Sequence, residues 1–329
     1  MKDLIFNSKG KRIRHGDKTI LAGILNVTPD SFSDGGRYIK LEDAIDRVAL
    51  MIEEGALMID VGGESTRPGS EAISEEEEMS RVLPAIEAIR KRWSHIFISL
   101  DTWRANVAKA GLKAGADIIN DITALLGDAK MASVIKEADA ALIAMFNPLL
   151  IRPDHEGSKV FRKFGYGEPF SKDEMSLINK LEIVDAMKVF FAKTLSICKE
   201  MGIGKDHIML DPGIGFGLTL KENLSLLESI ESIHNMGYLS FVGISRKRFI
   251  IKLLQDIGYK IDISTEKGLL EADEASAFFS SILAFNSANV LRVHNVAFHA
   301  KAILAGNAIR RAKYEQDINF SQYLPKKNQ

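Results

Sequence analysis

Short apolar runs alternate along this chain with longer stretches in which apolar residues recur at helical spacing. The short runs predict strands that are buried on both faces, and the longer stretches predict amphipathic helices. The predicted strands are Ile20–Leu25, Leu57–Val61, Ile96–Leu100, Asp117–Ile119, Ala141–Met145, Ile208–Leu210, Leu239–Gly243 and Val290–Val293. Eight buried strands, each followed by a helix, fit an α/β fold of the (β/α)8 TIM barrel type better than an open sheet.

Two further segments complete the predicted architecture. Leu4–Ile13 resembles a short N-terminal hairpin that turns at Ser8-Lys9-Gly10 and covers the lower end of the barrel. The segment at about 146–179 predicts a long loop, and loops of this length are either functional or partly disordered. The 329 residues could form two average domains, but single α/β barrels reach this length, so we predict one domain over residues 1–329.

One helix start is recognisable from the sequence alone. Ser74 with Glu77 three residues later forms a capping-box pattern, and the acidic first turn suits the helix dipole. Arg90, Lys91 and Arg92 give the same helix a basic end. We therefore interpret the acidic run Glu75–Glu78 as a solvated helix start without a functional role.

Composition narrows the class of partner. The formal net charge of -1 argues against nucleic acid or an anionic membrane as a partner, and 46% hydrophobic residues suffice for a large core. The single cysteine, Cys198, lies in an apolar helical stretch and is expected to be a core residue. The N-terminus has no long apolar run, so we expect no signal peptide or membrane span and a cytoplasmic protein.

Polar residues follow most of the predicted strands, at the end of a barrel where chemistry takes place. Each one alone could be a cap or a turn residue, but so many after different strands predict a binding site. They are Asn26, Asp60, Asp101, Asn120, Asp211, Ser245, Lys247, Arg292 and His294.

The residue types suggest a ligand with a nitrogen-rich ring. Asp211, held in an Asp-Pro-Gly turn, can accept two parallel hydrogen bonds from a guanidine-like edge such as that of a 2-amino-4-oxopyrimidine. Asn120 offers a donor and an acceptor to ring nitrogens, and Lys247 can donate to a ring carbonyl or nitrogen. These three residues together favour a heterocycle as the ligand and not a sugar.

A second group of residues suits phosphate. Arg67, Arg292 and His294 are donors for phosphate oxygens, and Asn26 offers a neutral oxygen to a magnesium ion that keeps most of its waters. No GxxxxGK[ST] sequence is present, so the glycine-rich stretch DPGIGFG from Asp211 indicates close backbone approach to a ring and not a nucleotide loop.

Seven stretches, in order along nearly the whole chain, resemble dihydropteroate synthases. They are GILNVTPDSFSDGG from Gly23, IDVGGESTRPGS from Ile59, SLDTWRANVA from Ser99, INDIT from Ile119, LDPGIGFG from Leu210, GISRKRF from Gly243 and LRVHNV from Leu291. The resemblance implies a (β/α)8 barrel that joins 6-hydroxymethyl-7,8-dihydropterin diphosphate to para-aminobenzoate and releases pyrophosphate in bacterial folate synthesis. It also implies that the enzyme is a target of sulfonamides.

The same resemblance implies roles for single residues. The pterin positions are matched by Asp101, Asn120, Asp211, Lys247 and Arg292. The diphosphate and Mg²⁺ positions are matched by Asn26, Arg67 and His294, and we expect catalysis from these three with Lys247 and Arg292. The para-aminobenzoate pocket and its loops are matched by Phe32, Thr66, Pro68, Phe216 and Ser245, with Ser245 expected at the start of the helix after the seventh strand, a reasonable anion site.

The sequence departs from the common family pattern after the fifth strand. Many members have Met-His-Met-Gln-Gly there, whereas this chain has Met145-Phe146-Asn147-Pro148, similar to a variant of some Gram-positive members. This leaves open which side chain packs on the pterin face, and a core position for Phe146 is at least as good an interpretation. Asn295 replaces the aspartate that often follows the last histidine, outside the ligand-facing pair Arg292 and His294.

Two alternative functions are a pterin-dependent methyltransferase domain and a non-catalytic pterin-binding protein. A methyltransferase has no use for a diphosphate and should lack the Asn26–Gly36 and Glu64–Gly69 loops, which are both present. A non-catalytic descendant would typically have lost loop or diphosphate residues. Ala277–Phe285 is apolar on more faces than one barrel helix needs, which suggests a surface that contacts a partner. Because the family it resembles is commonly dimeric, we predict a homodimer.

Overall fold

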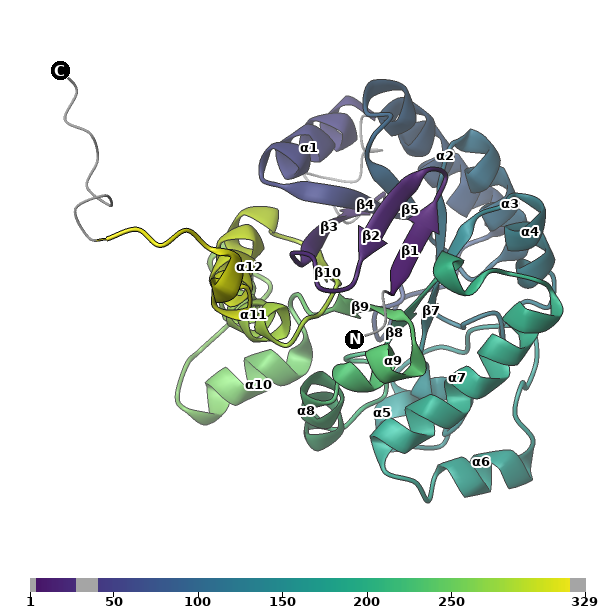
Figure 1. Ribbon diagram of the computed structural model, residues 1–329. Coiled ribbons are helices and arrows are strands. Elements are labelled where there is room, and N and C mark those ends of the chain that lie inside the picture. The colour runs from purple at the N-terminus through teal and green to yellow at the C-terminus, as the bar shows by residue number, and fades with distance from the viewer. Residues whose placement is uncertain (1–3, 28–40, 320–329) are drawn as a thin grey trace.

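A computed structural model describes residues 4–27 and 41–319, and within them eight parallel strands close into a barrel with helices outside (Figure 1). The strands are β3 (Ile20–Asn26), β4 (Ala56–Gly62), β5 (Phe97–Asp101), β6 (Ile118–Asp121), β7 (Ala141–Met145), β8 (Ile208–Asp211), β9 (Leu239–Gly243) and β10 (Val290–Val293). β10 pairs in parallel with both β9 and β3 and so closes the barrel. All eight predicted strands are confirmed, with ends that differ by at most two residues.

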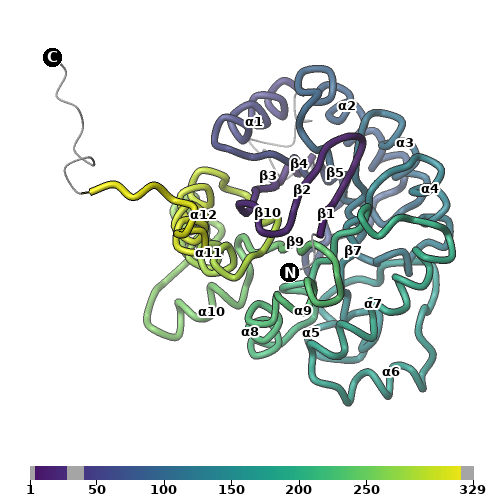
Figure 2. The backbone as a smooth tube through the Cα atoms, viewed as in Figure 1, coloured from purple at the N-terminus to yellow at the C-terminus, as the bar shows by residue number. Residues whose placement is uncertain are grey.

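The helices form a ring around the strands, as the tube in Figure 2 shows. They are α1 (Leu41–Glu53), α2 (Glu75–Arg92), α3 (Ala105–Ala114), α4 (Met131–Glu137), α5 (Glu156–Lys159), α6 (Lys172–Ile178), α7 (Ile183–Glu200), α8 (Leu220–Glu228), α9 (Glu231–Met236), α10 (Arg248–Asp256), α11 (Glu266–Phe285) and α12 (Val296–Arg310), with short 3-10 turns η2 (Pro148–Leu150), η3 (Lys205–His207) and η4 (Ala312–Tyr314). Among the described residues, no helix is long and apolar enough to cross a membrane.

The N-terminal hairpin lies across the N-terminal end of the barrel, in front of the strands in Figure 1. β1 (Ile5–Ser8) and β2 (Lys11–Arg14) pair around Lys9 and Gly10, and the positive φ of both residues matches the right-handed twist of a tight hairpin. Phe6 is fully buried in a cluster with side chains from the barrel strands. The predicted lid is confirmed, and the cluster closes the lower end of the core.

The helix start at Ser74 is confirmed, but one residue of its acidic run is not solvated. Ser74 Oγ accepts a hydrogen bond from Glu77 N at 3.1 Å, and α2 ends with the predicted basic turn. Glu78, however, is only 1% exposed and forms an ion pair with Arg104. The interpretation of Glu75–Glu78 as a wholly solvated surface was therefore wrong for Glu78, because α2 turns that position toward α3 and β5.

The connection between β7 and α7 is a folded segment that contains η2, α5 and α6. Phe146 at its start is fully buried, with ring centroids 5.3 Å from Phe190 and 6.4 Å from Phe191 on α7. Phe146 therefore fills the layer between barrel and helices, as the second interpretation of its role expected. Cys198, also on α7, is buried as predicted, and burial raises the pKa of its thiol to about 12.

Candidate active site at the carboxyl ends of the strands

A pocket lies at the carboxyl ends of the barrel strands and brings together all five residues predicted for the pterin ring. It is lined by Thr66, Asp101, Asn120, Ile122, Met145, Asp211, Ile214, Phe216, Gly243, Lys247 and Arg292. Met145 thus lines the pocket, whereas Phe146 packs away from it against α7. Asn26, Arg67, Pro68, Ser245 and His294 are outside this lining, and Phe32 lies outside the described residues.

Arg292 is held by two carboxylates that come from neighbouring strands. Its Nε donates to Asp60 Oδ2 at 2.5 Å, and its Nη2 donates to Asp101 Oδ2 at 2.7 Å. Asn120 Nδ2 donates to the Asp60 oxygens at 3.3 and 3.4 Å. Asp60 is fully buried, so it orients a guanidinium and an amide without reaching the pocket itself. Sequence reasoning noted Asp60 at a strand end but did not assign it this role.

The electrostatics of the carboxylates follow from their burial. Burial raises the pKa of Asp101 to about 7, against the opposing charge of Arg292 and with support from the negative charge of Asp60. Burial also raises the pKa of Asp211 to about 6, although Gly213 N donates to Asp211 Oδ1 at 2.8 Å. Buried carboxyls with pKa values raised into this range are typical of functional sites.

The Asp-Pro-Gly turn that holds Asp211 depends on glycine. Gly213 has φ +73, and a Cβ there would overlap the carbonyl oxygen of Phe146. Gly215 has φ +86, and a Cβ there would meet Cδ of Lys247 at 2.8 Å. Both positions therefore need glycine for conformation and for space, which brings the Lys247 stem and the turn into contact.

Lys247 is the N-cap residue of α10, and its side chain lines the pocket. Its Nζ lies 5.3 Å from the centroid of the Phe216 ring, and burial lowers the pKa of its amine to about 8. An amine of this kind is still mostly protonated at pH 7 but is poorly solvated, so it donates readily to a ring atom that replaces water.

Positive groups gather beside the pocket. Partial desolvation and the charges of Arg246 and Arg292 lower the pKa of Arg67, which remains exposed, and no ion pair of Arg67 is found in the described part of the chain. His294 is subject to the same field: burial and the neighbouring arginines hold its pKa well below the usual value. Arg292 and Arg246 are each paired with described carboxylates, whereas Arg67 has no such partner, so this side of the pocket favours a bound anion.

Ser245 contacts His294 and does not begin a helix. Its Oγ lies 3.0 Å from His294 Nδ1 and accepts from His294 N at 3.2 Å. α10 begins at Arg248, so the expectation of Ser245 at a helix start was wrong, because Arg246 adopts a positive φ of 57° and turns the chain first. Arg246 itself donates to both oxygens of Asp273, at 2.7 and 2.8 Å. Its proximity to His294 was missed, since nothing in its sequence spacing marks it.

Asn26 ends β3 opposite Gly62 on β4. Among the described residues, no group of three His, Cys, Asp or Glu side chains could hold a metal ion. A single amide oxygen fits only a cation that takes most of its ligands from water and substrate phosphates, as Mg²⁺ does.

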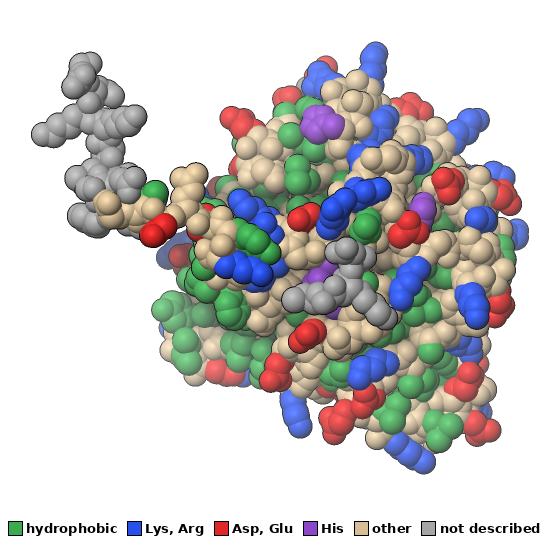
Figure 3. Space-filling model, in the orientation of Figure 1, with side chains coloured by type: hydrophobic (Ala, Val, Ile, Leu, Met, Phe, Trp, Pro, Cys, Tyr) green, Lys and Arg blue, Asp and Glu red, His purple; other side chains and the backbone are tan. Residues whose placement is uncertain are grey.

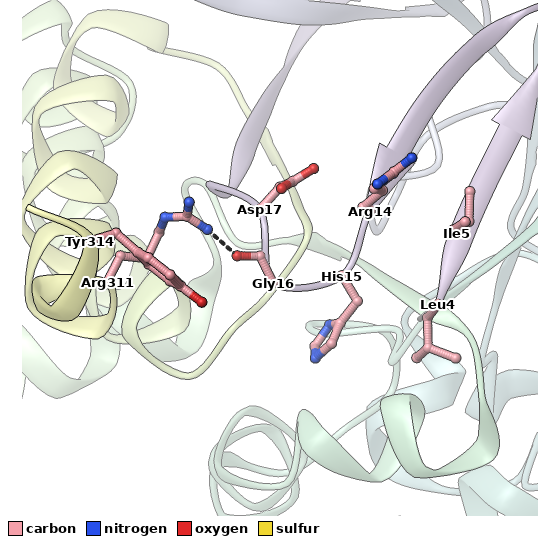
Figure 4. A pocket seen from close by; sticks show the side chains of 8 residues that line it. All are labelled: Leu4, Ile5, Arg14, His15, Gly16, Asp17, Arg311 and Tyr314. Carbon is pink, nitrogen blue, oxygen red and sulfur yellow. Dashed lines mark hydrogen bonds between the residues drawn. The ribbon is translucent and has the colours of Figure 1, made fainter. Parts of the chain in front are cut away.

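A second cavity, of about 400 Å³, lies at the opposite end of the barrel, between the hairpin and the end of the C-terminal helix (Figure 4). The arginine side chains at this cavity already make hydrogen bonds. Arg311 donates to the carbonyl of Gly16, as the dashed line in Figure 4 marks, and its neighbour Arg310 donates to the carbonyl of Asp17 at 2.6 Å. These bonds join the C-terminal helix to the turn after β2. At the N-terminal end of a barrel, such features serve stability and not chemistry.

The chain matches the family model described as "Pterin binding enzyme" over residues 22–294. It is 40% identical to the dihydropteroate synthase of Bacillus subtilis strain 168 over 76% of this chain and 78% of that protein. Its fold matches the Clostridium difficile dihydropteroate synthase crystallised with pteroic acid (TM-score 0.71, 34% identity, 90% of this chain and 98% of the other). A similar match is the Xanthomonas albilineans enzyme with 4-aminobenzoic acid (TM-score 0.76, 29% identity, 94% and 99%).

Proposed function

Because the chain belongs to the dihydropteroate synthase family of pterin-binding enzymes, we propose that its strand-end pocket joins 6-hydroxymethyl-7,8-dihydropterin diphosphate to para-aminobenzoate. The protein is a transferase of folate biosynthesis, and the products are 7,8-dihydropteroate and pyrophosphate. One observation carries the assignment of the site: three polar groups suited to a heterocycle, Asp211, Asn120 and Lys247, line one pocket with Arg292, and Arg67 and His294 lie beside it.

The pterin binds at Asp211. With a pKa of about 6, this carboxyl is mostly ionised at pH 7 and accepts two parallel hydrogen bonds from the 2-amino group and the adjacent ring nitrogen. Lys247 and Asn120 reach the remaining polar atoms of the ring. Asp60 keeps Asn120 and Arg292 in place, so the ring meets groups whose orientation is already set.

The reacting bond joins the pterin methylene to a diphosphate oxygen. As this bond breaks, negative charge gathers on the leaving diphosphate, and Arg67, Arg292 and His294 are the described groups able to meet it. The aromatic amine is neutral at pH 7 and attacks the electrophilic methylene directly: the C–N bond forms, the C–O bond to the diphosphate breaks, and the amine proton passes to water, so no general base is required. The lowered pKa of His294 keeps its ring neutral until an anion binds.

Asn26 would hold Mg²⁺ through its amide oxygen, with the other positions of the ion filled by water and diphosphate. When bound there, the ion would supply charge neutralisation to the diphosphate. The donor set supports this proposal, because one neutral oxygen at a strand end suits an ion that arrives with its phosphate ligand.

Para-aminobenzoate binds second, between the Thr66–Pro68 segment and Phe216, with Ser245 as the expected contact for its carboxylate. The related Xanthomonas enzyme has been crystallised with this compound. The order follows if diphosphate and Mg²⁺ must first organise the loops after β3 and β4. Calorimetric binding of para-aminobenzoate to the free enzyme, as tight as with pyrophosphate, magnesium and pterin present, would contradict the order.

The oligomeric state that we propose is a homodimer formed through α11 and α12. Phe278, Ile282 and Phe285 on α11 are 66%, 59% and 50% exposed, and Leu304 on α12 is 65% exposed. Hydrophobic side chains gather over this side of the molecule in Figure 3. A continuous apolar face of this kind on two packed helices favours a protein partner. Light scattering at micromolar concentration that gives only the monomer mass would contradict the dimer.

The test of the function is pyrophosphate release that requires both substrates. Release with the pterin diphosphate and para-aminobenzoate together, and not with either alone, is the expected result. Product formed from methyl-tetrahydrofolate and a corrinoid would instead support a methyltransferase, and pterin binding without turnover would support a non-catalytic binding protein. The cytoplasmic location stays a prediction.

A further inference from the structure

The segment Phe161–Phe164, in the long connection between β7 and α7, contacts both sides of the strand-end pocket. On one side it contacts Glu64, which directly precedes the Ser65–Gly69 stretch. On the other side it contacts Phe216, which lines the pocket. Neither the family resemblance nor the chemistry of the reaction assigns a role to this segment, so its contacts are informative.

The first contact joins Arg162 to a buried carboxylate. Arg162 Nη2 lies 2.6 Å from Glu64 Oε2, and the Glu64 side chain is 4% exposed. Glu64 also accepts from Arg104 Nη2 at 2.9 Å and from Trp103 Nε1 at 3.2 Å. Burial alone would raise the pKa of Glu64, but Arg162 and Arg104 hold it below its usual value, so the carboxylate stays charged and paired.

Glu64 in turn fixes both ends of the loop that carries Thr66. This loop connects β4 to α2. Glu64 lies near its start, and Glu64 Oε1 accepts a hydrogen bond at 3.3 Å from the backbone N of Ile73, which lies just before α2. Arg104 Nη2 also donates to the carbonyl of Ile73 at 2.9 Å. Arg162 therefore acts on the carboxylate that sets where the loop starts and ends.

The second contact is aromatic. The Phe161 and Phe216 rings stack at an interplanar angle of 19° with centroids 5.6 Å apart. Phe164, 2% exposed, packs with Trp103, Ile122 and Met145, of which the last two line the pocket. The guanidinium of Arg162 lies 4.4 Å from the Phe164 ring centroid, so the ionic and aromatic contacts form one unit.

We propose that Phe161 and Arg162 are positioning residues for the second substrate, acting through Phe216 and Glu64 to hold the two walls between which para-aminobenzoate binds. The inference rests on the proposed function. Asp211 and Arg292, two of the residues proposed to meet the pterin, are held independently of this segment, Asp211 by its turn and Arg292 by Asp60 and Asp101. Loss of the positioning contacts should therefore affect one substrate and spare the other.

The test compares Arg162→Gln and Phe161→Leu with the wild-type enzyme, and uses Lys163→Gln as a matched control because Lys163 is the exposed neighbour. Each of the first two variants should raise KM for para-aminobenzoate by about tenfold to a hundredfold, the effect of losing a supporting contact. KM for the pterin diphosphate and kcat at saturation should stay within about twofold of wild type. Lys163→Gln should match wild type in all three quantities.

Two further variants test whether Arg162 acts through Glu64. Arg162→Lys keeps a cation and should recover part of the affinity for para-aminobenzoate. Arg162→Gln added to Glu64→Gln should raise KM little beyond the single Glu64 change, since coupled residues are not additive. Because Glu64 keeps Arg104 and Trp103, Arg162→Gln should fold, which thermal unfolding checks.

Unchanged KM for para-aminobenzoate in both Arg162→Gln and Phe161→Leu would overturn the inference. Equal increases in KM for both substrates would also overturn it, because they would indicate a general loss of structure. Failure of the proposed function is a separate result, since it would appear as no pyrophosphate release by the wild-type enzyme.

Discussion

The two ends of the barrel contain the same kinds of buried groups but pair them differently. At the N-terminal end, Asp117 accepts from Lys11 Nζ at 2.8 Å, from Arg90 Nη2 at 2.5 Å and from Ile98 N at 2.8 Å. At the carboxyl end, the side-chain carboxylate of Asp211 accepts one hydrogen bond, from Gly213 N, within the described part of the chain. A carboxylate with three donors, two of them cationic, stabilises the fold, whereas a buried carboxylate with open acceptor positions is ready for a ligand.

The buried histidines show the same difference. His234, near the N-terminal end, has Nε2 3.0 Å from Asn289 Oδ1 and 3.2 Å from Ser240 Oγ, and burial lowers its pKa to about 4. His294 is also neutral, but its neighbours include Arg246, Arg292 and Arg67. The first histidine belongs to a polar network that satisfies its members. The second lies in a positive field that an anion would complete.

The largest expected effect is on stability and comes from the N-terminal end. Asp117→Ala leaves Lys11 and Arg90 without their shared partner, and should lower the free energy of unfolding by about 3 to 5 kcal/mol. Urea unfolding measures the loss. Pterin affinity of the folded fraction should be unchanged, and a weakened affinity would break the division between the two ends.

Next in size is the effect of Arg67→Ala on turnover. Loss of one cation that meets charge in the transition state should lower the single-turnover rate by about 100- to 1000-fold. Arg311→Ala, which removes an arginine from the other end, is the matched control and should leave the rate unchanged. A large loss of pterin affinity with an intact rate would identify Arg67 as a ground-state clamp and contradict the role proposed here.

Asp211→Asn should weaken binding of the pterin diphosphate by about 2 to 4 kcal/mol, because a donor replaces one acceptor and ring donors lose their partners. Stability should respond in the opposite sense to that of Asp117→Ala. A raised pKa in the folded state means that the ionised Asp211 carboxylate destabilises the folded protein at pH 7. Asp211→Asn should therefore not lower the free energy of unfolding. Calorimetry and urea unfolding measure the two effects, and unchanged affinity would refute the assignment of Asp211.

The smallest effect is a pH dependence. Asp211 must be ionised to accept from the ring, so pterin affinity should fall as the pH drops below about 6, by about tenfold per unit at most. Stability should change the other way. Because the folded pKa values of Asp211 and Asp101 are raised, to about 6 and about 7, the folded state binds more protons and its stability decreases as the pH rises from 4 toward 7.

Asp211→Asn supplies the control for this measurement, because titration of the ligand itself remains in the variant. If the variant keeps the full dependence of pterin affinity on pH between 5 and 8, the titrating group is not Asp211. Para-aminobenzoate affinity at fixed saturating pterin should vary less over the same range.

Much of the fold and part of the site could be predicted from the sequence, because both depend on local patterns. The apolar runs determine the strands, and a residue that directly follows a buried strand in a parallel barrel must lie at the carboxyl end. Asp101, Asn120, Asp211, Lys247 and Arg292 were found in this way and share one pocket. The turn at Asp211 was also local, since its glycines mark it.

Only the tertiary structure decided which groups are paired. Asp60 and Arg292 meet across 232 residues, and Glu64 meets Arg162 from a connection that sequence patterns describe only as a long loop. Glu78 shows the limit most clearly, because its acidic neighbours predict solvent while the packing of α2 buries it beside Arg104. Strand and helix patterns record which face of an element is apolar. They do not show which charged residue, distant in the sequence, packs against that face. The pairing of buried charges depends on that packing.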